Sequence, residues 1–135
     1  MSVFVVWIDR EHARIFEISS EKMERKTIKA HHGDHHTHRL DSIDQKNQEW
    51  HFFQEVANFL GKADRLLILG PGVAKYHFRS YLGEHTPVLA KKLVGCETVD
   101  HPTDNQIAAY AKNFFDLSVE QMTSVNAAAA SEGKS

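Results

Sequence analysis

Two short apolar runs place the strongest limit on how this chain can fold. Val3–Asp9 (VFVVWID) and Arg65–Gly70 (RLLILG) are almost continuously apolar, which is typical of strands buried inside a sheet. Directly after the first run, His12–Ser19 alternates apolar and polar side chains, so it is predicted to pair with that run as a hairpin. A more polar segment, Glu24–Ala30, predicts a third strand near a sheet edge.

Helices are predicted before and after the second apolar run in the sequence. Asn47–Leu60 carries its apolar side chains at helical spacing, which indicates an amphipathic helix. A Gly-Pro-Gly sequence ends the second run, and Val73–Leu82 is predicted as a helix that Gly83 terminates. Thr86-Pro87 signals another helix start, and that helix is expected to continue into the sequence VLAKKLV.

The C-terminal part of the chain predicts one more strand and one more helix. Gly95–Asp100 is the predicted strand, and Thr103 with Gln106 forms a capping-box pattern before a helix over about Asp104–Leu117. The order β-β-β-α-β-α-α-β-α predicts an α/β fold, a three-layer mixed sheet with an N-terminal antiparallel hairpin and helices packed on it. We expect one domain over residues 1–117 and a small, polar, disordered tail over residues 118–135.

Composition and charge exclude several classes of protein. The chain of 135 residues is 41% hydrophobic and carries a formal net charge of −2, which argues against avid, non-specific nucleic-acid binding. Its single cysteine, Cys96, cannot form an internal disulfide and is expected to pack as a small hydrophobe. There is no run long enough to span a bilayer and no signal peptide at the N-terminus, so we expect a cytoplasmic protein without a membrane partner.

Two segments resemble a known family. The sequence RLLILGPGVAKYHFRSYL resembles the strand–Gly-Pro-Gly–helix segment in the middle domain of archaeal and eukaryotic class-one peptide-chain release factors and of Pelota. The opening VFVVWIDREHARIFEI resembles the first hairpin of that domain, and the similarity covers about Ser2–Leu117. The resemblance implies the fold called translational machinery component.

The chain departs from that family in one functional loop. Release factors carry Gly-Gly-Gln after the third strand, and this motif enters the peptidyl-transferase centre. Here the corresponding segment, His31–Arg39, has no Gly-Gly pair and no glutamine. The resemblance therefore implies a stand-alone, bacterial-type relative of the middle domain, a non-catalytic translation-associated module that binds the ribosome or structured RNA.

The Gly-Pro-Gly junction is the first candidate site. The amino end of a helix offers unpaired N–H groups and a partial positive charge, and the segment from Pro71 to Cys96 holds four basic residues and one acidic residue. An exposed Tyr76 on the same helix would be able to stack on a base. The alternative is a tight turn in which the glycines serve geometry only. The predicted RNA or phosphate contacts are Gly70, Gly72, Lys75, Arg79, Lys91 and Lys92.

A histidine-rich loop is the second candidate site. Imidazole and carboxylate side chains suit zinc or nickel, and short histidine-rich tracts often bind metal. Adventitious metal binding, or a solvated loop that becomes charged below about pH 6.5, explains the same sequence. The candidate ligands are His31, His32, Asp34, His35, His36 and His38.

A metal-dependent nuclease or a peptidyl-tRNA hydrolase is the remaining alternative. Paired carboxylates support two-metal phosphodiester cleavage, and several acidic residues precede or follow predicted elements. Asp9, at a strand end, and Asp100, before His101-Pro102, are equally well explained as turn and cap residues. The acidic residues considered are Asp9, Glu11, Asp41, Asp44, Asp100 and Asp104.

Overall fold

The computed structural model describes residues 2–18, 23–30 and 42–115 of the chain. The chain forms two compact units, residues 1–101 and 102–135, and each is described by itself. Within the described residues, no helix has the length and apolar character needed to cross a membrane.

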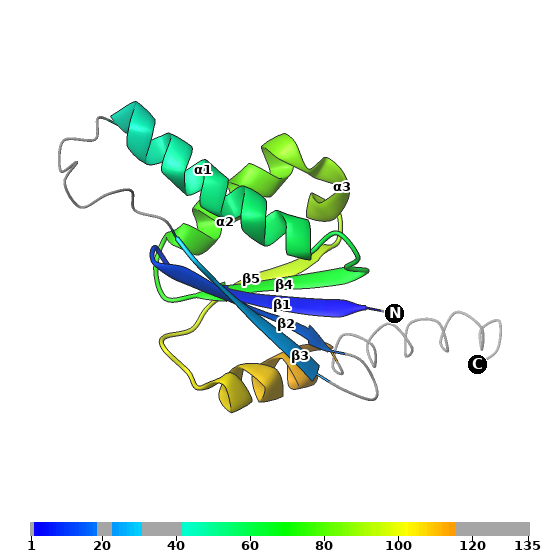
Figure 1. Cartoon of the computed structure of the whole chain (residues 1–135). Helices are drawn as coiled ribbons and strands as arrows, with labels where there is room; N and C mark the ends of the chain where they lie inside the picture. Colours follow the sequence, from blue (N-terminus) through cyan, green and yellow to red (C-terminus); the bar gives the residue numbers. More distant parts are fainter. Residues whose placement is uncertain (1, 19–22, 31–41, 116–135) are drawn as a thin grey trace. The chain divides into compact units, whose positions relative to one another are not determined.

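The first unit is built on a five-stranded mixed sheet in the order β3-β2-β1-β4-β5 (Figure 1). The antiparallel part joins β1 to β2 and β2 to β3, and the parallel part joins β1 to β4 and β4 to β5. This arrangement confirms the predicted α/β class, the N-terminal hairpin and the edge position of the third strand. The bounds are β1 Val3–Ile8, β2 His12–Ile18, β3 Met23–Lys29, β4 Arg65–Gly70 and β5 Leu93–Thr98.

Three helices belong to the same unit and cover one face of the sheet (Figure 1). Along β1, Phe4, Val6 and Ile8 point to that face and join the hydrophobic core, because successive strand residues face opposite sides. Phe53 of α1 and Phe78 of α2 pack in the same core, with their ring centroids 5.3 Å apart. The bounds are α1 Ser42–Phe59, α2 Ala74–His85 and α3 Pro87–Ala90.

The predicted end of α2 at Gly83 is wrong. The helix continues through Gly83, where a side chain would meet nothing within 4 Å, and ends at His85. Pro87 disfavours a helical conformation in the residue before it, and Thr86 accordingly has φ −138° and ψ 65°. The proline, rather than the glycine, therefore marks the end of this helix.

The predicted helix through VLAKKLV is also wrong beyond its first turn. The helical part, α3, ends at Ala90, and Leu93 and Val94 belong to β5. Leu93 pairs with Leu66 of β4, and the Leu66 N–H donates to the Lys92 carbonyl over 2.9 Å. Long-range pairing with a buried strand thus overrides the local helical pattern. At the other end, α1 starts five residues before the predicted Asn47.

The second unit contains a helix over residues 104–115. Its predicted capping box is confirmed: the Thr103 N–H donates to Gln106 Oε1 over 2.9 Å, and the Gln106 N–H donates to Thr103 Oγ1 over 3.2 Å. These two bonds satisfy N–H groups that a helix start leaves without intrahelical partners. The predicted tail, residues 118–135, lies outside the described residues.

Candidate functional site

The β4–α2 junction, residues Gly70 to Arg79, begins with a glycine that the fold requires. Gly70 ends β4 next to β1, and a Cβ at this position would overlap the carbonyl oxygen of Ile8. Backbone cannot move aside as a flexible side chain would, so only glycine fits here. Gly72, two residues later, is exposed and has open space around it. The two predicted glycines therefore differ: one is set by packing, and the other is not.

Lys75 is turned into the protein. Its side chain is 2% exposed, and its Nζ donates a hydrogen bond to the carbonyl oxygen of Gly72. The same ammonium lies 4.4 Å from the centre of the Tyr76 ring, a favourable cation–π distance. Lys75 thus fastens the Gly-Pro-Gly turn to the first turn of α2 and does not present its charge to solvent.

Tyr76 and Arg79 form the exposed part of the junction, here called the Tyr76–Arg79 surface. Tyr76 is 38% exposed, and the Arg79 guanidinium lies 5.1 Å from its ring centre. The amino end of α2 has no side-chain cap and no acidic residue in its first turn, so its own first turn does not neutralise the partial positive charge there. This surface offers a cation and an aromatic ring together.

Cys96 of β5 is near two cations of α2. Burial raises the pKa of its thiol, while the nearby charges of Arg79 and Lys75 act in the opposite direction. Cys96 packs against the core as a partly buried side chain, which agrees with the prediction of a small hydrophobe. The two cations of the junction are therefore close to the same point of β5.

Lys91 and Lys92 stand apart from the junction. The Lys92 carbonyl is bound by Leu66, near the start of β4, whereas Gly70 is the last residue of that strand. A strand rises about 3.3 Å per residue, so the length of β4 separates the two groups. The structure brings Gly70, Gly72, Lys75 and Arg79 together and places Lys91 and Lys92 at the opposite end of β4. RNA contact by any of the six stays a prediction.

A hollow of about 470 Å³ opens at the carboxyl ends of β1 and β4. Asp9 in its wall acts as a turn residue, because its Oδ1 accepts the backbone N–H groups of Glu11 and His12 over 2.8 and 2.9 Å. Asp100 Oδ1 lies 2.9 Å from Nδ1 of its neighbour His101. The lining residues are Asp9, Arg10, Glu11, Pro71, Gly72, Val73, Ala74 and His101.

The predicted metal site cannot be placed. His31, His32, Asp34, His35, His36 and His38 lie outside the described residues, as do Asp41 and the side chain of Asp44. In the part of the chain that the structure describes, no three His, Cys, Asp or Glu side chains are grouped closely enough to hold a metal ion.

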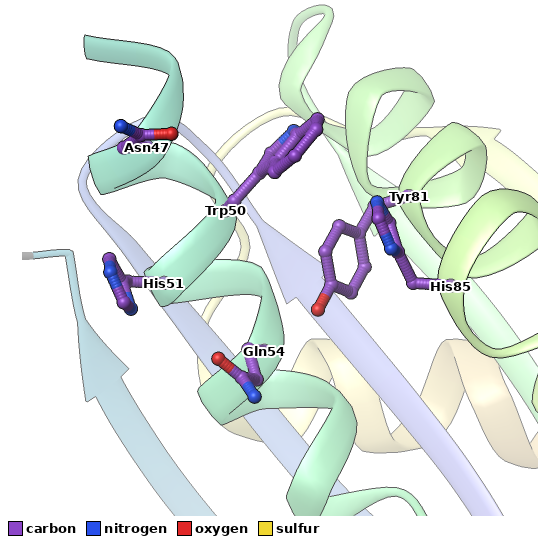
Figure 2. Close-up of a pocket in the computed structure, with 6 residues that line it drawn as sticks. All are labelled: Asn47, Trp50, His51, Gln54, Tyr81 and His85. Atoms are coloured by element: carbon purple, nitrogen blue, oxygen red, sulfur yellow. The ribbon is translucent and has the colours of Figure 1, made fainter. Parts of the chain in front are cut away.

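A second pocket, between α1 and α2, was not singled out from the sequence. It has a volume of about 270 Å³, and Figure 2 shows Trp50 projecting from α1 toward α2, with Tyr81 and His85 projecting from α2. The signal was present as i, i+3, i+4 and i+7 spacing along α1 and i, i+4 spacing along α2. We call this cavity the α1–α2 pocket. Its lining residues are Asn47, Trp50, His51, Gln54, Tyr81 and His85.

Comparison with known sequences finds a relative over most of the chain. The chain is 32% identical over 95 residues to the protein pelota homologue of Methanocaldococcus jannaschii, a match that covers 68% of this chain and 26% of that protein. The chain thus spans about a quarter of the length of its curated relative. No protein-family model matches the sequence.

Solved structures agree with this match. Archaeoglobus fulgidus Pelota superposes with a TM-score of 0.63 at 20% identity, covering 97% of this chain and 37% of its own. An archaeal translation termination factor superposes with a TM-score of 0.61 at 17% identity, covering 98% of this chain and 42% of its own. These similarities confirm the resemblance of fold drawn from the sequence. The chain has the fold of a domain of Pelota and of the archaeal translation termination factors.

Proposed function

We propose that this chain is a non-catalytic, translation-associated module that binds the ribosome through RNA. The observation that carries the proposal is the fold it shares with an archaeal translation termination factor. The non-catalytic part rests on the sequence after β3, where His31–Arg39 stands in place of Gly-Gly-Gln.

The Tyr76–Arg79 surface is the contact that we assign to RNA. Arginine is suited to phosphate oxygens because its guanidinium presents several N–H donors in one plane. An exposed tyrosine offers a face on which a base can stack. Lys75 supports this surface from below through its contact with the Tyr76 ring, and Lys91 is a separate, exposed cation near the start of β5.

Salt-dependent sedimentation with ribosomes tests the proposal. We expect the purified chain to pellet with ribosomes through a sucrose cushion at low salt and to be released as salt rises, because phosphate contacts displace counterions. Arg79→Glu should weaken the association. It should also reduce the slope of log affinity against log salt concentration by about one, as expected when one phosphate contact is lost. Lys62→Glu, a charge reversal at an exposed position after α1, is the matched control. Wild-type protein that stays in the supernatant at the lowest salt would contradict the proposal.

A hydrolysis assay tests the non-catalytic part separately. Peptidyl-tRNA incubated with the chain and ribosomes should remain intact, with and without added divalent metal. Release of peptide at a rate above that of ribosomes alone would show that the chain is an enzyme and would leave the ribosome contact standing.

A further inference from the structure

The α1–α2 pocket has an aromatic wall that the core holds in place. The His85 ring lies between two others, 4.9 Å from the Trp50 ring and 4.6 Å from the Tyr81 ring by their centroids. Tyr81 in turn packs on Phe53 at 5.7 Å, and Phe53 is 1% exposed. Because buried neighbours support these rings, little side-chain freedom is lost when a ligand stacks on them.

The polar groups of the pocket are two amides, two imidazoles and the Tyr81 hydroxyl. Asn47 and Gln54 each carry one carbonyl acceptor and one NH₂ donor, and His51 and His85 add ring nitrogens. The lining residues include no Lys, Arg, Asp or Glu. Such a set suits a planar ligand with alternating donors and acceptors on its edge, and it does not suit an isolated ion.

The size and the surroundings narrow the ligand further. The volume of about 270 Å³ is just below the range of roughly 300–1,000 Å³ in which drug-sized ligands bind, so one ring system fits. One carboxylate lies beside the pocket: Glu84 Oε2 is 3.8 Å from Nε2 of the lining residue His85. Negative charge at the rim disfavours a phosphate at this place.

We propose that the α1–α2 pocket takes a single unstacked nucleobase, which stacks on the aromatic wall and is read by the amides of Asn47 and Gln54. Bases splayed out of single-stranded RNA are bound in this way by aromatic side chains. The proposal rests on the proposed function only for the source of the base, because a free nucleoside presents the same chemistry.

Nuclear magnetic resonance on the whole chain gives a direct test. The chain has two tryptophans, so its indole N–H groups give two signals, and Trp50→Phe identifies the one in the pocket. Adenosine should shift the Trp50 signal and leave that of the buried Trp7 in place. Adenosine monophosphate should bind within about threefold of adenosine, and inorganic phosphate should shift neither signal. A monophosphate that binds far more tightly, or a Trp50 signal that no nucleoside moves, would overturn the proposal.

Variants outside the core separate binding from folding. Gln54→Ala removes one hydrogen-bonding partner from an exposed position and should weaken adenosine binding by about three- to tenfold. Asn58→Ala, an exposed amide on the same helix that does not line the pocket, should leave binding unchanged. Trp50→Ala should weaken it by on the order of tenfold or more. Equal binding by wild type and both pocket variants would place the ligand elsewhere.

Two RNA arms then identify the source of the base. Single-stranded hexa-adenylate that binds more tightly than adenosine supports an RNA base, and adenosine that binds more tightly than the oligomer supports a free nucleoside. A paired duplex that shifts the Trp50 signal as strongly as the single strand would contradict base insertion. If the chain sediments with ribosomes but no nucleoside shifts the Trp50 signal, the pocket proposal is wrong and the proposed function still stands.

Discussion

The β4–α2 junction and the α1–α2 pocket share helix α2. They differ in whether their polar groups bind other groups of the protein or line a pocket. At the junction, Lys75 is buried and its ammonium is bound to the Gly72 carbonyl, and Gly70 has no room for a side chain. In the pocket, the rings of Trp50, Tyr81 and His85 lie between α1 and α2, and the amides of Asn47 and Gln54 lie on α1 (Figure 2). The contrast teaches that the part of the chain most like a known motif serves mainly the fold. Among the described residues, the pocket and the Tyr76–Arg79 surface are the two places that we assign to partners.

The largest expected effect is at Gly70. Gly70→Ala should lower the free energy of unfolding by about 3 kcal/mol, because the new Cβ overlaps the Ile8 backbone and forces two paired strands apart. Gly72→Ala, two residues away in open space, should change it by less than about 0.5 kcal/mol. Urea denaturation measures both. Similar losses for the two variants would mean that packing does not distinguish these glycines.

The next effect concerns the buried ammonium. Lys75→Met keeps most of the side-chain volume but leaves the Gly72 carbonyl without its donor, and should cost about 2 kcal/mol of unfolding free energy. Lys91→Met, at an exposed position, is the matched control and should be nearly neutral. If both variants have the same thermal unfolding temperature as the wild type, Lys75 has no structural role and its charge must be free for other contacts.

A smaller effect is expected at Cys96, beside the junction. Because burial raises the pKa of this thiol, it remains protonated at neutral pH and should react with iodoacetamide more slowly than in the urea-unfolded chain. The rate should rise with pH and reach half its maximum above the ordinary thiol pKa. Arg79 acts to lower that pKa, so Arg79→Met should move the midpoint still higher. A folded chain that reacts as fast as the unfolded one would contradict the burial of Cys96.

The smallest effect is expected in the pocket. The double variant His51→Ala with Gln54→Ala should change the free energy of unfolding by less than about 0.5 kcal/mol, because both side chains are exposed and surface substitutions away from packing features cost little. Urea denaturation beside Gly70→Ala makes the comparison direct. A loss of unfolding free energy above about 2 kcal/mol would show that the pocket residues, like those of the junction, stabilise the fold.

Strands β1 to β4 were predictable from sequence, because each has a local pattern, whereas β5, predicted over Gly95–Asp100, runs over Leu93–Thr98. The β4 range Arg65–Gly70 was predicted without error, and β1 and β2 were placed to within one residue at their ends. The error at β5 lies where a distant partner decides. Leu93 and Val94 look helical beside Pro87, but pairing with β4 makes them a strand, and no local pattern reports that pairing.

The candidate site was predictable only in part. The sequence located the Gly-Pro-Gly junction and its basic residues, but the direction in which Lys75 points depends on the turn it binds. The α1–α2 pocket forms because residues of α1, such as Asn47, come close to residues of α2, such as His85. Whether they come close depends on how the two helices pack on the sheet. Charge and spacing along one segment carry no information about it.

Ribosome sedimentation of Arg79→Glu beside Lys75→Met tests the central claim most directly, at a temperature where urea titration shows both variants folded. The account predicts that Arg79→Glu loses much of its ribosome association, whereas Lys75→Met retains that of the wild type despite its lower stability. Retention by Arg79→Glu with loss by Lys75→Met would contradict the account, since the buried ammonium would then be the RNA contact.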